Sequence, residues 1–216
     1  KWTELAVGDY ENDATQDVFH AGFQNQRLFR DEKRRFVDIT TRAGLDDKEH
    51  WNTSASFVDV DNDGYLDLFV CRYVEFGPNS REFCLNGKVQ TACAPRTYPS
   101  ETSVLYRSVG GKRFVPVTPE VFSKSAGKSW AVIPIDHDDD GWTDLYVAND
   151  EEPADFWHNR GGKRFENIAF KNGTALSPSG LAYGGMGIAA ADYDGDGRQD
   201  LFLASFTEQH KSLFRN

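Results

Sequence analysis

A ten-residue acidic segment that recurs along the chain constrains the fold more than any other feature of the sequence. Its three intact copies span residues 59–68, 136–145 and 192–201 and align without gaps. Each copy has aspartate at positions 1, 3, 5 and 9, glycine at position 6 and leucine at position 10. A divergent copy at residues 9–18 has Glu11 at position 3 and Ala14 at position 6. Such repetition predicts several equivalent structural units.

Each acidic segment precedes an apolar, strand-like run. A second recurring element follows about twenty residues later, if an insertion in the second unit is left out of the count. This element is an apolar pair followed by Arg or His, at residues 28–30, 105–107, 156–158 and 213–215. Adjacent glycines then come at residues 110–111 and 161–162, where their positive φ suits a tight hairpin. The acidic segments start 50, 77 and 56 residues apart. A period near fifty with about four short strands is typical of a propeller blade.

We therefore expect an all-β fold in which residues 1–216 form a single repeat domain of about three and a half β-propeller-type blades. The expected units are approximately 1–50, 51–127 with an insertion at 71–104, 128–183, and an incomplete 184–216. The last unit stops at Asn216, where its hairpin turn should begin. So few units would not close a propeller ring, so we expect further blades from outside these residues, or another kind of stacking.

The acidic segments have the composition of calcium loops placed between strands. Aspartates at positions 1, 3 and 5 can direct their carboxylates inward, glycine at position 6 permits a sharp turn, and aspartate at position 9 closes the shell. Ca²⁺ prefers about six to eight oxygen ligands of this kind at ~2.3–2.6 Å. Mg²⁺ retains more of its waters, and Zn²⁺ favours His or Cys, which these loops lack apart from His137 at a position not expected to bind metal.

Three sites are predicted in the intact loops, with the position 7 residue acting through its backbone carbonyl. The expected ligands are Asp59, Asp61, Asp63, Tyr65 and Asp67 in the first intact loop, Asp136, Asp138, Asp140, Trp142 and Asp144 in the second, and Asp192, Asp194, Asp196, Arg198 and Asp200 in the third. The divergent segment would use Asp9, Glu11, Asp13, Thr15 and Asp17, with a solvated acidic run as the alternative there. EF-hand loops are disfavoured because position 12 is Val70, Val147 or Leu203 instead of glutamate, and no amphipathic helix flanks the loops.

These loops resemble those of the FG-GAP/VCBS repeat family, and other segments are similar to its ASPIC/UnbV-type members, relatives of cartilage acidic protein. The further similarities are the 105–107 triplet with its glycine hairpin, residues 185–189 before Asp192, and the stretch from Cys84 to Tyr98. The resemblance implies integrin-α-like blades, calcium as a structural ion, and roles in adhesion, glycan contact or surface assembly. The divergent first loop and the missing half blade depart from the family pattern.

Cys84 and Cys93 lie nine residues apart in the Gly- and Pro-containing insertion, which predicts a disulfide. Two free thiols in an intracellular protein are the alternative. Cys71 follows a strand-like run and is expected to be a small buried residue. With the resemblance, this favours a secreted or cell-surface protein, with the periplasm as another location.

The net charge and the absence of known catalytic motifs limit the classes of function that the sequence allows. Seventeen of the 34 acidic residues lie in the four segments, and the net charge of −10 disfavours a nucleic-acid partner. Four Ca²⁺ ions would bring this charge to −2. No apolar run approaches the ~20 residues of a membrane span. We expect no catalytic residues and no enzyme, because the sequence has no G-x-S-x-G, H-E-x-x-H or Gly-rich phosphate loop.

The sequence thus predicts a calcium-binding extracellular structural or adhesive module that self-assembles or belongs to a larger propeller or fibre. Its expected partners are calcium, other copies or further blades, and surface glycans. The alternatives are a lyase-like propeller of a polysaccharide-active enzyme and a lectin-like glycan binder. For glycan stacking the candidates are Trp51, Trp130, Trp142 and Trp157, although most of them lie at repeat-equivalent or near-equivalent positions, which favours packing between strands.

Overall fold

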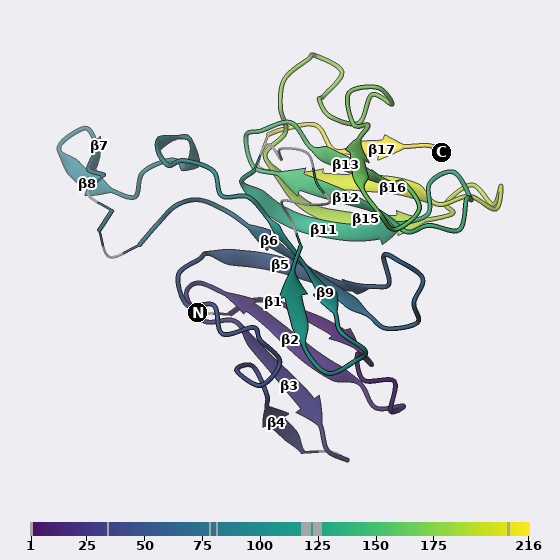
Figure 1. The fold of residues 1–216 in the computed structure, drawn as a ribbon. Coiled ribbons are helices and arrows are strands. Elements are labelled where there is room, and N and C mark those ends of the chain that lie inside the picture. Colours follow the sequence, from purple (N-terminus) through teal and green to yellow (C-terminus); the bar gives the residue numbers. More distant parts are fainter. Residues whose placement is uncertain are drawn as a thin grey trace.

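Four antiparallel sheets follow one another along the chain and form the body of the protein (Figure 1). The structure is a computed structural model that describes residues 2–33, 35–77, 79–80, 82–117, 122, 127–206 and 208–216. Three of the sheets have four strands and the last has three within this part of the chain. The all-β expectation with propeller-type blades is confirmed.

The strands are short and mostly meander from one edge of each sheet to the other. The first sheet contains β1 (Trp2–Gly8), β2 (Asp17–Gly22), β3 (Arg27–Asp31) and β4 (Phe36–Asp38). The second contains β5 (Asn52–Val58), β6 (Asp67–Arg72), β9 (Val104–Ser108) and β10 (Phe114–Pro116). The third contains β11 (Ser129–Ile135), β12 (Asp144–Asn149), β13 (Asp155–Asn159) and β14 (Phe165–Asn167). The fourth contains β15 (Gly185–Ala191), β16 (Asp200–Ser205) and β17 (Ser212–Phe214).

The sheets pack face against face, with the first strands β1, β5, β11 and β15 adjacent in that order. In each of the first three sheets, an aromatic residue of the second strand fills the space to the following sheet: Phe19, Phe69 and Tyr146 lie in the three apolar clusters between sheets. Because β6 and β12 are covered on both faces, they read as continuous apolar runs instead of alternating ones.

The outer faces of the first and fourth sheets are not covered by another described sheet. Phe202, which occupies the position of Phe19, Phe69 and Tyr146 in the repeat, is 44% exposed, whereas those three are at most 2% exposed. Its cross-strand neighbour Leu213 is also exposed. Leu5 and Val7 of β1 are exposed at the opposite end of the row. Both ends therefore present apolar sheet surface to solvent.

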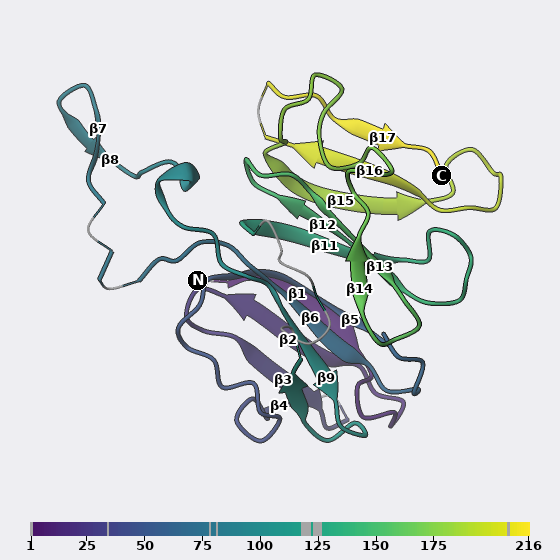
Figure 2. The ribbon, with the colours of Figure 1, turned by 45° about the horizontal axis from the view of Figure 1, so that its top comes forward.

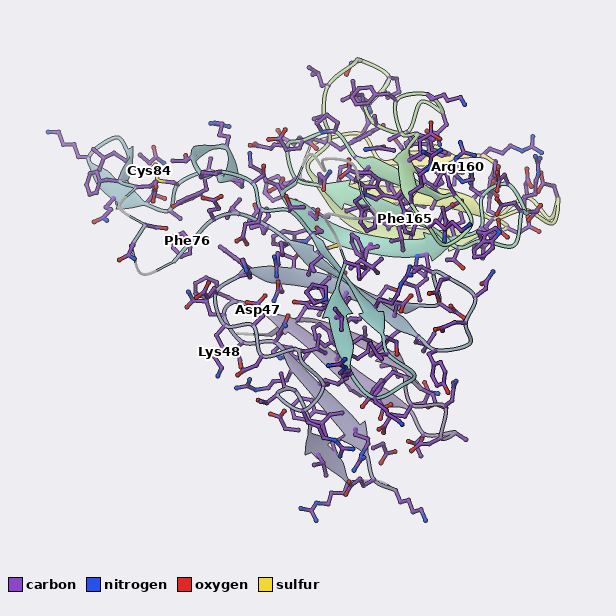
Figure 3. The ribbon with its side chains drawn as sticks, viewed as in Figure 1. Asp47, Lys48, Phe76, Cys84, Arg160 and Phe165 are labelled. Atoms are coloured by element: carbon purple, nitrogen blue, oxygen red, sulfur yellow. A yellow bond between two sulfur atoms is a disulfide. The ribbon has the colours of Figure 1, made fainter. Side chains whose placement is uncertain are left out.

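The insertion between β6 and β9 forms an arm that projects from the sheets in both ribbon views (Figures 1 and 2). It carries the hairpin of β7 (Cys84–Asn86) and β8 (Val89–Thr91) and the 3₁₀ turn η1 (Pro95–Thr97). A disulfide joins Cys84 to Cys93 (Figure 3), which confirms the predicted pairing. Cys71 is fully buried, as expected. Among the described residues, no helix has the length and hydropathy needed to span a bilayer.

Candidate metal centres

Each acidic segment forms the loop between the first and second strands of a sheet, so strands and not helices flank it. Because the four sheets share one orientation, all four loops lie at the same side of the molecule, away from the disulfide arm (Figures 1 and 2). Neighbouring loops also touch. The Asn12 side chain donates to the Gly64 carbonyl at 2.6 Å, and the Asn62 side chain donates to the Gly141 carbonyl at 3.1 Å. The first three loops thus form a connected row.

The aspartate at position 1 fixes the turn of its loop by accepting two backbone hydrogen bonds. Asp59 accepts from the N–H groups of Asp63 at 3.2 Å and Gly64 at 2.9 Å. The other three loops repeat this pattern from Asp9, Asp136 and Asp192. The divergent first loop therefore has the same backbone shape as the intact ones.

The position 6 residue adopts the left-handed conformation in every loop. Gly64, Gly141 and Gly197 have φ values of 87°, 82° and 92°, and Ala14 takes φ 67° at the equivalent place. No atom within 4 Å would obstruct a Cβ at the three glycines, so the backbone conformation alone explains the residue type. Ala14 adopts this conformation at a steric cost, because its Cβ crowds the backbone, and the glycines have no Cβ.

The aspartate at position 9 is buried and ties its loop to the third strand of the sheet. Asp67 is 1% exposed and accepts from the Val60 N–H at 3.2 Å and the Ser108 N–H at 2.7 Å. Burial raises the pKa of Asp67 to about 7 and that of Asp17 to about 6, against the hydrogen bonds that lower them. A nearby cation would favour the charged form of both groups.

Carboxylate oxygens converge in the three intact loops. In each of these loops, three residues each offer one ligand atom that lies within 4.8 Å of the other two. The groups are Asp59–Asp61–Asp67, Asp136–Asp138–Asp140 and Asp192–Asp194–Asp200. Such all-oxygen sets fit Ca²⁺. Among the described residues, the first loop forms no such group, and Asp63, Asp144 and Asp196 are not brought into the all-acid groups of their loops. The position 5 aspartates Asp63, Asp140 and Asp196 each accept the N–H of the position 7 residue, at 2.9, 2.9 and 3.0 Å.

Basic residues of the third strands contact the position 3 carboxylates. Arg107 lies 3.2 Å from Asp61, and Arg215 lies 2.7 Å from Asp194. The glycine hairpin of the third sheet also packs against the acidic loop of the second sheet. A Cβ added at Gly162 would come within 2.8 Å of the Asp61 backbone. The second glycine of the hairpin thus serves close packing as well as positive φ.

The third sheet differs, because His158 replaces the arginine and His137 occupies position 2 of its loop. The structure brings these two imidazoles together around Asp144. Sequence spacing did not reveal this pair, since the histidines are twenty-one residues apart. An alignment of the four strand triplets could have singled out His158, because the other three triplets have arginine at its position.

An aromatic pocket lies between the arm and the sheets. It has a volume of about 490 Å³, and its aromatic lining is Trp51, Tyr73, Phe76, Tyr98 and Trp130. Two of the tryptophans expected to stack on glycans therefore share one pocket. Trp157 is 1% exposed within the core, so it packs between strands, as its repeat position favours, and is not open to a glycan. Trp142 is half-buried and lies against Gly162.

Comparison with known proteins agrees with this architecture. A family profile described as "FG-GAP-like repeat" matches residues 2–70 and 136–203. No curated protein matched the sequence. Among solved structures, the chain is similar to an Agrocybe aegerita lectin described as specifically recognising non-reducing terminal N-acetylglucosamine, with a TM-score of 0.50 and 15% identity. The alignment covers 93% of this chain and 46% of the lectin, so this chain spans about half of that protein's length. At this identity the similarity concerns the fold alone.

Proposed function

The chain belongs to the FG-GAP-like repeat family, and from this premise we propose that it is a calcium-stabilised structural or adhesive module outside the cell. The finer affiliation with ASPIC/UnbV-type proteins is part of the proposal, supported by the sequence of the 105–107 triplet and of the arm. No catalytic role is included, because the convergent carboxylates are accounted for as metal ligands.

The observation that carries the proposal is the convergence of three carboxylates in each intact loop, on one side of a row of sheets. Carboxylates held this close repel one another, and a divalent ion would relieve the repulsion. Because the first three loops are hydrogen-bonded to their neighbours, ions bound in this row would stiffen one continuous surface. We propose that this surface is what the module presents to its partners.

A location outside the cell is supported by the arm disulfide, since such bonds persist in oxidising compartments. Two N-glycosylation sequons begin at Asn52 and Asn172. Asn52 is 1% exposed and donates to the Gln26 side chain at 2.8 Å, so the folded chain does not present it. Asn172 is exposed.

Calorimetric titration with Ca²⁺ tests the proposal. The metal-free chain should bind three ions at the intact loops, and Asp61→Asn, Asp138→Asn and Asp194→Asn should each remove or strongly weaken one of them. Asp46→Asn, which changes an exposed acid outside the loops, is the matched control and should leave the stoichiometry unchanged. Absence of binding heat, together with a melting temperature that chelator does not lower, would contradict the proposal.

A second candidate function, glycan binding, is favoured by the aromatic pocket. Aromatic faces such as those of Trp51 and Trp130 can stack on sugar rings, and Ser80, Glu82 and Thr91 also line the pocket and offer polar groups. A glycan array probed with the wild type and with Trp130→Ala tests this reading. Binding that the substitution abolishes supports it, and no binding by either protein removes it. Incubation with uronate polysaccharides should yield no new unsaturated ends, and their appearance would favour the lyase-like alternative instead.

A further inference from the structure

We propose that the acidic loop of the third sheet, residues 136–145, also contributes to a site for a divalent transition ion such as Zn²⁺, bound by His137, His158 and Asp138 and supported by Asp144. The inference goes beyond the proposed function, because it concerns a different class of metal and does not require calcium in any loop.

The four residues form a tight cluster at the side of the molecule that carries the loops. One candidate ligand atom from each lies within 4.8 Å of every other. The imidazole rings of His137 and His158 are 4.9 Å apart between centroids and nearly perpendicular. Asp144 is completely buried and His158 is 3% exposed, whereas His137 and Asp138 are partly open to solvent. The cluster therefore has a rigid inner part and an accessible entrance.

Asp144 orients both imidazoles. Its Oδ1 lies 3.0 Å from Nδ1 of His158, and its Oδ2 is in short contact with Nδ1 of His137. Because a carboxylate only accepts hydrogen bonds, this arrangement places a proton on Nδ1 of each ring and leaves the lone pair of His158 Nε2 facing Asp138. His137 faces Asp138 through Nδ1, at 3.8 Å from Oδ1, so its ring must rotate to present a free nitrogen to an ion held by Asp138. A histidine that donates one ring N–H to a carboxylate is the arrangement found in protein metal sites, where the other nitrogen binds the ion.

Asp138 supplies the oxygen ligand. Its Oδ2 lies 3.8 Å from Nε2 of His158, which is too long for a hydrogen bond. Two ligands of one tetrahedral zinc ion, at bonds of about 2.0–2.1 Å, are separated by about 3.3–3.4 Å. A small adjustment of the partly exposed Asp138 would thus accommodate an ion between these two atoms.

The other sheets provide a comparison within the same chain. At the position of His158 they carry Arg30, Arg107 and Arg215, each paired with the position 3 acid of its loop. At the position of His137 they carry Tyr10, Val60 and Tyr193. In the third sheet, a histidine, which can bind metal through a neutral ring nitrogen, stands in place of the permanently charged arginine of the other sheets. A second imidazole, that of His137, lies beside it. Imidazole ligands suit zinc, copper, nickel or cobalt, whereas calcium takes oxygen ligands.

This site shares Asp138 with the calcium set of the third sheet's loop, Asp136–Asp138–Asp140. The two ions would therefore compete for one carboxylate. We expect added Zn²⁺ to lower the apparent Ca²⁺ affinity of the loop at residues 136–145 and to leave the other two intact loops unaffected.

The test uses the full chain without a histidine tag. Zn²⁺ titration by calorimetry, and Co²⁺ titration followed by visible absorption, should show one bound ion whose spectrum indicates nitrogen ligation. In the double variant His137→Tyr/His158→Arg, which copies the residues of the first and fourth sheets, the affinity should fall by about 100-fold or more. Circular dichroism and the single variants establish whether any loss reflects misfolding.

His50→Gln is the matched control, because His50 also lies beside two acids, at 2.5 Å from Glu101 and 3.7 Å from Asp47. This variant should bind Zn²⁺ as the wild type does. If the double variant retains wild-type affinity, or if the wild type binds no stoichiometric Zn²⁺, the proposal is overturned and the histidines serve only as partners of Asp144. Loss of Ca²⁺ binding alone would contradict the proposed function and leave this result intact.

Discussion

Ala14 is the residue at which the loop repeat conflicts with its own sequence. It takes φ 67° where the three intact loops have glycine, yet its N–H donates to Asp9 at 2.8 Å as the glycines' N–H groups do to their aspartates. The left-handed conformation costs a residue with a Cβ roughly 1–2 kcal/mol, and glycine loses about 0.4–1 kcal/mol more in unfolded-state entropy. We expect Ala14→Gly to raise the free energy of unfolding by up to about 1 kcal/mol, as measured by denaturant titration. The reverse change, Gly64→Ala, should destabilise by a similar amount, and a stabilising Gly64→Ala would contradict the argument.

Asp67 gives the metal-free protein a pH dependence with a definite sign. Its pKa of about 7 lies above the ordinary carboxyl value, so between about pH 5 and about pH 7 the folded state binds more protons than the unfolded state. In chelator, stability should therefore fall as the pH rises through this range, and saturating Ca²⁺ should weaken or reverse the trend because the ion favours the charged carboxylate. Melting temperatures recorded at both pH values measure this. Asp67→Asn should flatten the chelator curve, and a metal-free protein that gains stability through this range would contradict the assignment.

At the scale of elements, the disulfide arm should behave independently of the sheets. The arm projects from the body, and its hairpin residues Leu85 and Val89 are exposed, so few core contacts depend on it. The Cys84–Cys93 bond closes a short loop and should stabilise the arm by roughly 2–3 kcal/mol. We expect Cys84→Ser/Cys93→Ser to accelerate hydrogen exchange and proteolysis within residues 82–94 and to change the melting temperature of the whole chain little. A large fall in that temperature would show that the arm supports the sheets.

Sequence reasoning predicted the elements well where repetition was strong and poorly where contacts were specific to one sheet. The aligned aspartates and paired glycines fixed the positions of loops and hairpins, because turn chemistry depends on residues close in sequence. The pairing of His137 with His158 was not predicted, because it arises only when β13 packs beside the loop that precedes β12. The burial of Trp157, by contrast, agrees with the packing between strands that its position in the repeat favours.

At the scale of the whole molecule, the two end faces are the feature that any account of assembly must explain. Between the described sheets, an aromatic residue of the second strand is buried against the next sheet, and at the fourth sheet the equivalent Phe202 is exposed. Exposed apolar sheet faces of this kind are typical of interaction surfaces. Further blades of a longer chain or the first sheet of another copy would both cover them.

The chain studied alone should therefore self-associate through these faces, with the surface around Phe202 of one copy packing on that around Leu5 of another. Because burying such a side chain contributes about 1.5–3 kcal/mol, Phe202→Glu should weaken association by roughly 10- to 100-fold. Sedimentation over a range of concentrations measures the effect. Phe170→Glu is the matched control, since Phe170 is 67% exposed in the loop after β14 and outside both end faces. A monomer at every concentration, or equal weakening by both substitutions, would mean that these faces do not pair copies of this chain.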